Sequence, residues 1–285
     1  MQNTLQHCLT HLILVIAKAV KPQLLPRVHL MRANKNVNKP LAQRFLRLSV
    51  SHVLGAAALM AGLSYTGLSY AGPKGGVVQG GEGTITHNGN TTTVEQQTDN
   101  MLIDWDSYDI NQNERVHYIQ PDADSVSVNR IHSNHGSQIH GRIDANGHVV
   151  LINPHGIIFG ENSVVNAGGV LVSGLTLDAE RYMNGEFAFE ALGDGDGVVI
   201  NRGLIYAATG GSVGLLGQQV INEGFIEAKL GQVTLAAGKQ AVVSFDEAGL
   251  IGITVTKSIL QDELGLDAGV INSGSITASA GNVLL

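Results

Sequence analysis

The sequence contains a single cysteine, Cys8, which lies near the start of the chain. The rest of the protein therefore has no disulfide framework, thiol nucleophile or cysteine-bound metal site available to it. Aromatic residues are also scarce, at 5% of the chain. Glycine is abundant instead, with 36 of 285 residues, and it does not follow the collagen period. Together with segments rich in Val, Ile and Leu, this composition is typical of many short strands joined by turns.

Acidic residues are absent from the first 71 positions, which hold eight basic residues. All 24 acidic residues therefore lie in residues 72–285, and this strongly acidic part argues against nucleic acid as a partner. The basic segment ends in an apolar run from Val53 to Leu63, followed by Ser69-Tyr70-Ala71. This order is typical of an export signal, and the run is too short to span a membrane. We expect residues 1–71 to be an extended signal peptide cut between Ala71 and Gly72. A membrane anchor or an over-extended start are the alternatives.

A short unit, Gly-x-Ile-x-Ala, a loop, then Gly-x-Val-x-Leu, returns four times in the remaining chain. The copies begin at Gly141, Gly203, Gly224 and Gly274. The period of two places the apolar residues of each half on one face of a strand, and glycine supplies the turn between the halves. A unit of about 20 residues cannot bury such a face alone, so the copies must stack. The sequence therefore predicts an all-β solenoid of parallel strands.

The spacing of the copies predicts how many coils the solenoid has. The shortest interval, from Ile205 to Ile226, sets the period. The interval from Ile143 to Ile205 is close to three such periods, and the interval from Ile226 to Ile276 fits two periods with an insertion. Residues 72–285 would make roughly ten coils. Because the last copy ends in mid-coil and solenoids need a terminal cap, we expect the chain to be the N-terminal part of a longer protein.

Three copies share an asparagine two residues before the glycine, at Asn201, Asn222 and Asn272. Asparagine tolerates left-handed turn conformations. In stacked coils it can also form a ladder of amide hydrogen bonds. Both interpretations are structural, and the sequence leaves the choice between them open.

Residues 83–177 hold about a dozen short motifs in a fixed order. They include Gly83-Thr84-Ile85, Ile103-Asp104-Trp105, Tyr108-Asp109-Ile110, Val128-Asn129-Arg130-Ile131, Ile143-Asp144-Ala145-Asn146-Gly147 and Leu151-Ile152-Asn153-Pro154-His155-Gly156-Ile157. This segment closely resembles the secretion domain of filamentous-haemagglutinin-type exoproteins, the passengers of two-partner secretion. The resemblance covers about residues 75–240.

This resemblance implies a right-handed parallel β-helix with an N-terminal cap and extra-helical strands. From its apolar ring and its neighbours Tyr108 and Ile110, we expect Trp105 to pack the cap onto the first coils. A glycan-binding platform is the alternative for Trp105. It also implies an outer-membrane transporter whose periplasmic domains recognise the passenger, so that the protein leaves a Gram-negative bacterium through periplasm and outer membrane. The implied role of the whole, secreted or cell-surface exoprotein is adhesion to a host or neighbouring cell. A contact-dependent inhibition toxin or a haemolysin with the same front end is the alternative.

Two turns carry the family's candidate recognition motifs. The Asn-Pro-Asn-Gly turn of the family matches Asn153-Pro154-His155-Gly156, with histidine in the third position. An earlier Asn-Pro turn corresponds to the segment from Asn134 to Ser137, where Gly136 is kept but the proline and its fixed φ are missing. By resemblance, the transporter-recognition residues are Asn134, Gly136, Asn153, Pro154, His155 and Gly156. A purely structural role is the alternative, since Asn-Pro-x-Gly is a good turn sequence on geometry alone.

Three further patterns resemble catalytic or metal-binding motifs, but each lacks a feature that the motif requires. The run Gly210-Gly211-Ser212-Val213-Gly214 fits the Gly-x-Ser-x-Gly elbow of hydrolases, but no helix pattern follows it. His132, His135 and His140 lie close in sequence, as zinc ligands would, but do not share one strand face. Residues 193–197 contain one copy of a glycine–aspartate pattern that binds calcium only in tandem copies. We therefore expect a protein that is not an enzyme and that holds no metal or cofactor.

Overall fold

The computed structural model describes residues 72–178, 181–182, 186–193, 195–245, 251–258 and 268–285. The chain divides into two compact units, Met1–Gly67 and Leu68–Leu285, and all of the described residues belong to the second. This unit is built almost entirely from strands and turns, as predicted. The described part contains no helix of the length and apolarity that a membrane crossing requires. The predicted signal peptide, including Ala71 at its cleavage point, lies outside the described residues and stays a prediction.

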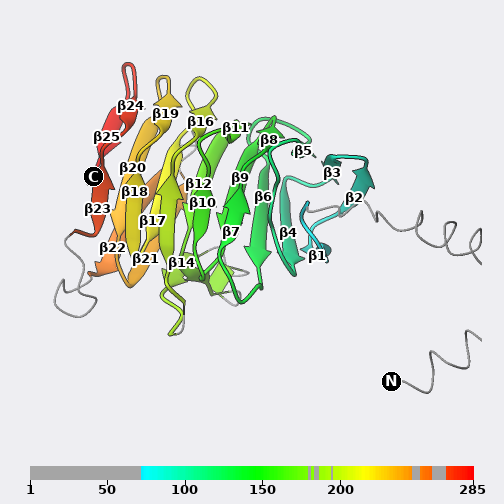
Figure 1. Ribbon diagram of the computed structural model, residues 1–285, viewed down its shortest axis with the longest axis horizontal. Coiled ribbons are helices and arrows are strands. Elements are labelled where there is room, and N and C mark those ends of the chain that lie inside the picture. Colours follow the sequence, from blue (N-terminus) through cyan, green and yellow to red (C-terminus); the bar gives the residue numbers. More distant parts are fainter. Residues whose placement is uncertain (1–71, 179–180, 183–185, 194, 246–250, 259–267) are drawn as a thin grey trace, which may run out of the picture. The chain divides into compact units, whose positions relative to one another are not determined.

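Three sheets form the sides of a right-handed parallel β-helix (Figure 1). Sheet 1 contains β1 (Val77–Gly80), β4 (Asn100–Trp105), β6 (Val126–Ile131), β9 (His148–Ile152), β12 (Gly169–Ser173), β17 (Val213–Gly217), β20 (Gln232–Ala237) and β25 (Asn282–Leu284). Sheet 2 contains β7 (Ser137–Ile139), β10 (Ile157–Phe159), β15 (Val198–Asn201), β18 (Gln219–Asn222) and β23 (Val270–Asn272). Sheet 3 contains β2 (Gly83–Asn88), β3 (Thr91–Gln96), β5 (Arg115–Ile119), β8 (Arg142–Ala145), β11 (Val164–Ala167), β16 (Leu204–Ala207), β19 (Phe225–Ala228) and β24 (Ser275–Thr277).

The N-terminal cap and the extra-helical strands are antiparallel. In the cap, β1 pairs with β4 and β2 pairs with β3. The extra-helical sheet consists of β13 (Thr176–Leu177), β14 (Phe187–Glu190), β21 (Gln240–Phe245) and β22 (Ile251–Lys257). Its apolar side chains, among them Phe189 and Val243, pack with Val150, Leu171 and Leu216 of sheet 1 in one buried cluster. The predicted β-helix with a cap and extra-helical strands is confirmed.

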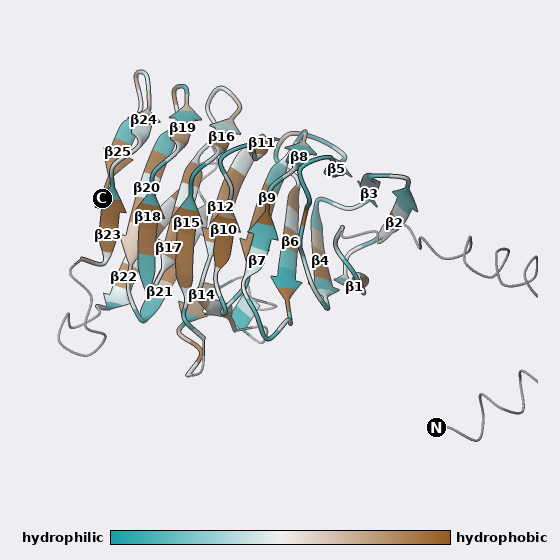
Figure 2. Ribbon diagram, in the orientation of Figure 1, coloured by the Kyte–Doolittle hydropathy of each residue, from teal (hydrophilic) through white to brown (hydrophobic). Residues whose placement is uncertain are grey.

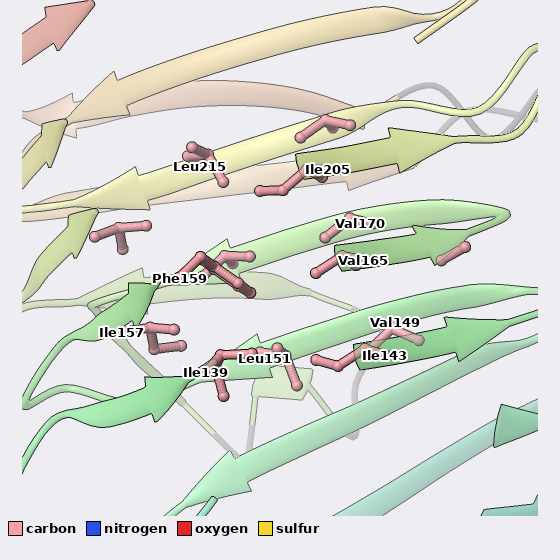
Figure 3. Close-up of a cluster of buried hydrophobic side chains, with 14 of the residues drawn as sticks. Ile139, Ile143, Val149, Leu151, Ile157, Phe159, Val165, Val170, Ile205 and Leu215 are labelled. Carbon is pink, nitrogen blue, oxygen red and sulfur yellow. The ribbon is translucent and has the colours of Figure 1, made fainter. Parts of the chain in front are cut away.

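The interior is filled by apolar columns that run from coil to coil (Figure 3). In sheet 3, Ile143, Val165, Ile205, Ile226 and Ile276 lie in register. The first four of these side chains are at most 1% exposed. The second half of each repeat lies in sheet 1, where equivalent residues form a parallel column. The stacking predicted from the period-two pattern is therefore confirmed.

The number of coils predicted from the spacing is wrong. Val165 pairs with both Ile143 and Ile205, so the interval between those isoleucines makes two steps, and Ile226 pairs directly with Ile276 in one step. Sheet 2 has five strands, so five described coils have a strand in all three sheets. The extra length lies between β12 and β15 and between β20 and β23, where the described strands β13, β14, β21 and β22 form the extra-helical sheet.

The asparagine ladder is present in sheet 2. Asn201 Nδ2 donates to Asn222 Oδ1 at 2.8 Å, and Asn222 Nδ2 donates to Asn272 Oδ1 at 2.7 Å. Asn201 and Asn222 are fully buried, and Asn272 is exposed at the last described coil. None of the three has a positive φ, so their left-handed tendency is not used. Of the two interpretations of these residues, the ladder is confirmed.

The glycines between the two halves of the repeat are required for close approach and not for a left-handed conformation. A Cβ atom on Gly211, Gly231 or Gly281 would overlap the backbone oxygen of the equivalent glycine one coil earlier. The left-handed residue stands one position before, for example Leu230 at φ 56°. Glycine therefore sets how tightly this corner of the β-helix can stack.

The first coils enclose a buried polar network. Trp105 Nε1 donates to Asn129 Oδ1 at 3.0 Å, and Tyr118 donates its hydroxyl to the same oxygen at 2.9 Å. Tyr108 and Tyr118 share a hydrogen bond of 2.7 Å, and the Tyr108 ring meets that of Trp105 edge-on at 5.5 Å. Because Trp105 is 0% exposed, it packs inside the first coils as predicted, and the glycan platform is wrong.

Candidate recognition surface

The two candidate recognition turns lie at the same corner of the β-helix, where the chain passes from sheet 1 to sheet 2. We call this corner the 1–2 corner; it consists of residues 132–136, residues 153–156, Gln218, and the described residues between β12 and β15 and between β20 and β23. Both extra-helical excursions also leave from this corner. Among the described residues, the longest differences in the connections between strands therefore lie at one edge of the solenoid.

The second turn is held from inside by Asn153, which is fully buried. Its Oδ1 accepts a hydrogen bond from the His155 N–H at 3.0 Å, and its Nδ2 donates to Ser137 Oγ at 3.0 Å and to the His135 carbonyl at 3.1 Å. The Asn153 N–H donates to the Ser173 carbonyl one coil further on, at 3.0 Å. A single side chain and its backbone thus connect three successive coils.

Pro154 and Gly156 complete this turn. The Gly156 N–H donates to the Asn153 carbonyl at 2.9 Å, and Gly156 has a φ of 97°, a conformation that favours glycine. Pro154 is buried, and its carbonyl accepts from the Gly197 N–H at 3.0 Å. Asn153, Pro154 and Gly156 therefore fix the backbone, and the half-buried His155 is the side chain of this turn that reaches the surface.

The first turn packs directly under the second. A Cβ atom on Gly136 would lie 2.8 Å from the His155 carbonyl oxygen, so only glycine fits here without a shift. Asn134 and His135 are exposed beside it. The Ser133 hydroxyl donates to the His135 carbonyl and closes the turn without the missing proline. The two turns form one continuous surface with Asn134, His135 and His155 on its outside.

An ion-pair cluster lies on β4 and β6 next to this surface. Arg130 binds Asp104 with both ends of its guanidinium, at 2.7 and 2.9 Å, and His132 Nε2 lies 3.1 Å from the same carboxylate. Burial alone would raise the pKa of Asp104, but the hydrogen bonds and charges of Arg130 and His132 hold it below its ordinary value. Asp104 therefore stays ionised and keeps both partners in place.

Two hollows lie on either side of His155. The larger, of about 450 Å³, is formed by the turns, residues 195–196 and the outer face of sheet 2. The smaller, of about 240 Å³, lies between the turn and the extra-helical sheet and includes Arg130 and His132. The 1–2 corner thus presents a ridge with a depression on each flank, a shape suited to contact with another protein.

The family-model comparison matches residues 69–285 to the TPS secretion domain, the domain of two-partner secretion. The chain belongs to this family. Exoproteins of two-partner secretion are recognised by an outer-membrane transporter and secreted from Gram-negative bacteria, and this chain carries the secretion domain of such an exported protein.

Similar proteins from Haemophilus influenzae support the assignment to two-partner secretion. A heme/hemopexin-binding protein of Haemophilus influenzae is 36% identical over 244 residues, which cover 80% of this chain and 26% of that protein. A second heme/hemopexin-binding protein from Haemophilus influenzae is 36% identical over 111 residues, 38% of this chain and 12% of that protein. The crystal structure of the HMW1 secretion domain from Haemophilus influenzae has a TM-score of 0.67 at 36% identity, covering 74% of this chain and 55% of that one. The chain thus spans about a quarter of the longer-matched curated relative.

Other sequence patterns turn out to be parts of the two-partner secretion scaffold. Ser212 is fully buried, a strand follows it, and its Oγ accepts from the Gln232 N–H at 3.3 Å. His132 and His135 are exposed in the same segment between β6 and β7, and His140 is exposed after β7. Within the described residues, no group of three or more His, Cys, Asp or Glu side chains could hold a metal ion. In the glycine–aspartate pattern, outside position 194, Gly195 lies against the backbone carbonyl of Pro154 and the Gly197 N–H donates to the same carbonyl.

Two features of the surface were missed by reasoning from sequence. The Asp104–Arg130–His132 cluster joins two strands that are distant in sequence, so nothing local indicates it. The outer face of sheet 2 carries an isoleucine one position before each ladder asparagine, at Ile200, Ile221 and Ile271. That Val-Ile-Asn recurrence is visible in the sequence, and it could have shown that these strands are apolar on both faces.

Proposed function

We propose that residues 72–285 are a non-catalytic secretion module at the front of an adhesin or haemagglutinin, and that the transporter recognises it at the 1–2 corner. The observation that carries the proposal is the arrangement of the two motif turns. They stack into one surface that offers Asn134, His135 and His155 to a partner, while Asn153 and Pro154 are buried beneath it.

This arrangement divides the motif into two roles. Asn153 and Pro154 shape the turn, because their polar groups are satisfied within the domain. His155 and Asn134 supply the contact, because their side chains reach the surface. Loss of Asn153 should lower secretion and stability together, whereas loss of the exposed pair should lower secretion alone.

The test is export of the chain from cells that also express its transporter. Asn134→Ala with His155→Ala should reduce the exported amount at least fivefold, while the stability of the exported protein changes little, as for most surface substitutions, by about 0.5 kcal/mol or less. The matched control is His117→Ala with Asn166→Ala, one histidine and one asparagine on the outer face of sheet 3. Equal export of both double variants would remove the two turns from the recognition surface.

For the whole exoprotein, capture of heme or hemopexin is a second candidate beside adhesion. It is favoured by the 36% identity to the heme/hemopexin-binding protein over 80% of this chain. The shared region is the secretion domain, and it spans only 26% of that relative, so its cargo-binding part is not compared. Cells expressing the full-length exoprotein should be tested for attachment to epithelial cells and for binding of heme and hemopexin. Attachment without heme or hemopexin binding supports the adhesin, and the reverse result supports the second candidate.

A further inference from the structure

Three Asn-Gly pairs occur in the sequence, at Asn88-Gly89, Asn146-Gly147 and Asn184-Gly185. The third pair lies outside the described residues. Such pairs are chemically reactive, because the backbone nitrogen of the second residue can attack the side-chain amide of the first, and glycine has no Cβ atom to hinder the approach. The two described pairs lie in very different surroundings, so the structure allows their reactivity to be compared.

The first pair lies at the tip of the β2–β3 hairpin in the N-terminal cap. Asn88 is the last residue of β2 and pairs with Thr91 of β3, and a two-residue turn, Gly89-Asn90, joins them. Residues 88–90 are exposed, and a Cβ atom on Gly89 would meet nothing within 4 Å. β2 is the edge strand of sheet 3, so its end can open by parting from β3 alone. Figure 2 shows teal, the colour of hydrophilic residues, on β2.

Neither reacting group of this first pair is held in place. Within the described residues, no hydrogen bond involves the side-chain amide of Asn88 or the N–H of Gly89. The Gly89 nitrogen is therefore free to lose its proton to hydroxide. The Asn88 amide can turn toward this nitrogen once the extended backbone of Asn88 relaxes, and at the tip of the hairpin that relaxation breaks only the last strand pair.

The second pair is held at each of its reacting groups. Asn146 Oδ1 accepts from the Gln120 N–H at 2.8 Å, and Asn146 Nδ2 donates to the Gln120 carbonyl at 2.8 Å. The Gly147 N–H donates to Gln120 Oε1 at 2.9 Å. Gly147 is also buried, and a Cβ atom there would lie 2.6 Å from the Ser125 carbonyl oxygen. The nitrogen and the amide are thus both bonded to Gln120, one coil earlier, and must be released from it before they can react.

We propose that Asn88 is a site of spontaneous covalent modification in the folded protein, and that the fold protects Asn146 from the same reaction. The Gly89 nitrogen loses its proton and attacks Asn88 Cγ, which closes a five-membered succinimide ring, and the side-chain nitrogen leaves as ammonia. Water then adds to either carbonyl of the ring and opens it, leaving aspartate or isoaspartate at position 88. Each product carries one negative charge more than asparagine, and the reaction consumes only water.

The two products differ in their effect on the cap. Aspartate keeps the length of the main chain, so the hairpin keeps its pairing. Isoaspartate routes the main chain through Cβ, which adds one carbon at a two-residue turn whose length sets the register of β2 and β3. Accumulation of isoaspartate should therefore open the tip of the cap hairpin, while the coils beneath it keep their pairing.

The test follows both sites in the purified, exported protein during incubation in mildly alkaline buffer. Peptide mass spectrometry resolves the products at each position. In the folded protein, Asn88 should be converted at least tenfold faster than Asn146. In guanidinium chloride the two rates should agree within about threefold, because both pairs then react from an unfolded chain. Equal conversion of the two sites in the folded protein would overturn the proposal. So would a difference that persists undiminished in guanidinium chloride, since the local sequence and not the fold would then cause it.

Two variants separate the main-chain change from the added charge. Asn88→Gln should abolish conversion at position 88, and fresh Asn88→Asp carries the charge without the longer main chain. Hydrogen exchange of residues 84–94 should be at least fivefold faster in aged wild-type protein than in fresh protein. Aged Asn88→Gln and fresh Asn88→Asp should both match the fresh wild-type protein. Unchanged exchange in aged protein that has accumulated isoaspartate would overturn the predicted opening of the cap.

Discussion

The first and the last coils of this β-helix fill their interiors in different ways. In β4 to β6 the interior holds Trp105, Tyr108 and Tyr118, tied together through the amide of Asn129. From β15 onward it holds columns of Ile, Val and Leu with one repeated amide, the asparagine ladder. The first kind of interior closes on itself, because Trp105 and Tyr118 share one acceptor on Asn129 and Tyr108 bonds to Tyr118, so the hydrogen bonds of these rings stay within the first coils. The second kind of interior can repeat, because each coil presents the same apolar side chains and the same asparagine to the next coil. Closing an end and extending a stack therefore need different side chains.

The largest effect should come from placing a charge in the repetitive interior. Ile205→Asp puts a carboxylate at a fully buried position and should cost about 4 kcal/mol or more. Tyr206→Asp on the opposite face of β16 should cost about 1 kcal/mol, mainly its contact with Phe225. Urea unfolding of both variants measures the difference, and equal losses would refute the register. Strand parity alone places Thr234 on the outer face as well, where it would be expected to tolerate Asp. Thr234 is only 4% exposed, so Thr234→Asp cannot serve as the surface control.

A smaller effect compares the two kinds of interior through one amide each. Asn129→Ala leaves Trp105 Nε1–H and the Tyr118 hydroxyl without their acceptor, and should cost about 3 kcal/mol or more. The same substitution also removes the two hydrogen bonds that Asn129 Nδ2 donates to the carbonyls of Ser127 and Val150. Asn222→Ala removes only the two ladder hydrogen bonds, and Asn272 at its far side is exposed and can bond water. We therefore expect a cost of about 1–2 kcal/mol for Asn222→Ala. Denaturation curves that gave the opposite order would show that the ladder holds the fold more strongly than the closed network.

The smallest effect is a pH dependence confined to the first half. His148 on β9 is 7% exposed, and burial lowers its pKa below the ordinary value of 6.5, with Asp124 partly opposing the shift. The unfolded chain therefore takes up this proton at a higher pH than the folded chain. The stability that depends on neutral His148 is fully present above pH 6.5 and is lost as the pH falls through the lowered folded value. The same column holds Ser212, Gln232 and Asn282 in later coils, and none of these titrates.

Hydrogen exchange at pH 7 and pH 5 can measure this difference between the halves. Amides of β6 and β9 should lose protection at pH 5, and amides of β17 and β20 should not. His148→Gln should flatten the response, whereas His135→Gln at an exposed turn should leave it unchanged. A uniform loss of protection along the sheet would mean that His148 does not control it.

The sequence predicted the repetitive part of this molecule better than the rest. Period two and the recurring glycine place Ile205, Ile226 and Val233 correctly, because a column needs the same residue type at the same step. The coil number could not be predicted in this way, because chain that leaves the helix at a corner lengthens the interval without changing the pairing. The burial of Ser212 and Thr234 was equally hidden, since both point away from the interior and are covered by other parts of the fold. The motif turns were found by resemblance, and only the geometry separates buried Asn153 from surface His155.

The 1–2 corner has a practical consequence for engineering. Between β12 and β15, and again between β20 and β23, long segments leave the solenoid and return, yet the strands on either side keep their pairing with the coils above and below. Chain of very different length is thus accepted at this corner without a change of register in the three sheets. A foreign peptide or small domain grafted here would be displayed on the edge of an intact rod. The matching glycine corner between sheet 3 and sheet 1, where backbones nearly touch from coil to coil, offers no such room.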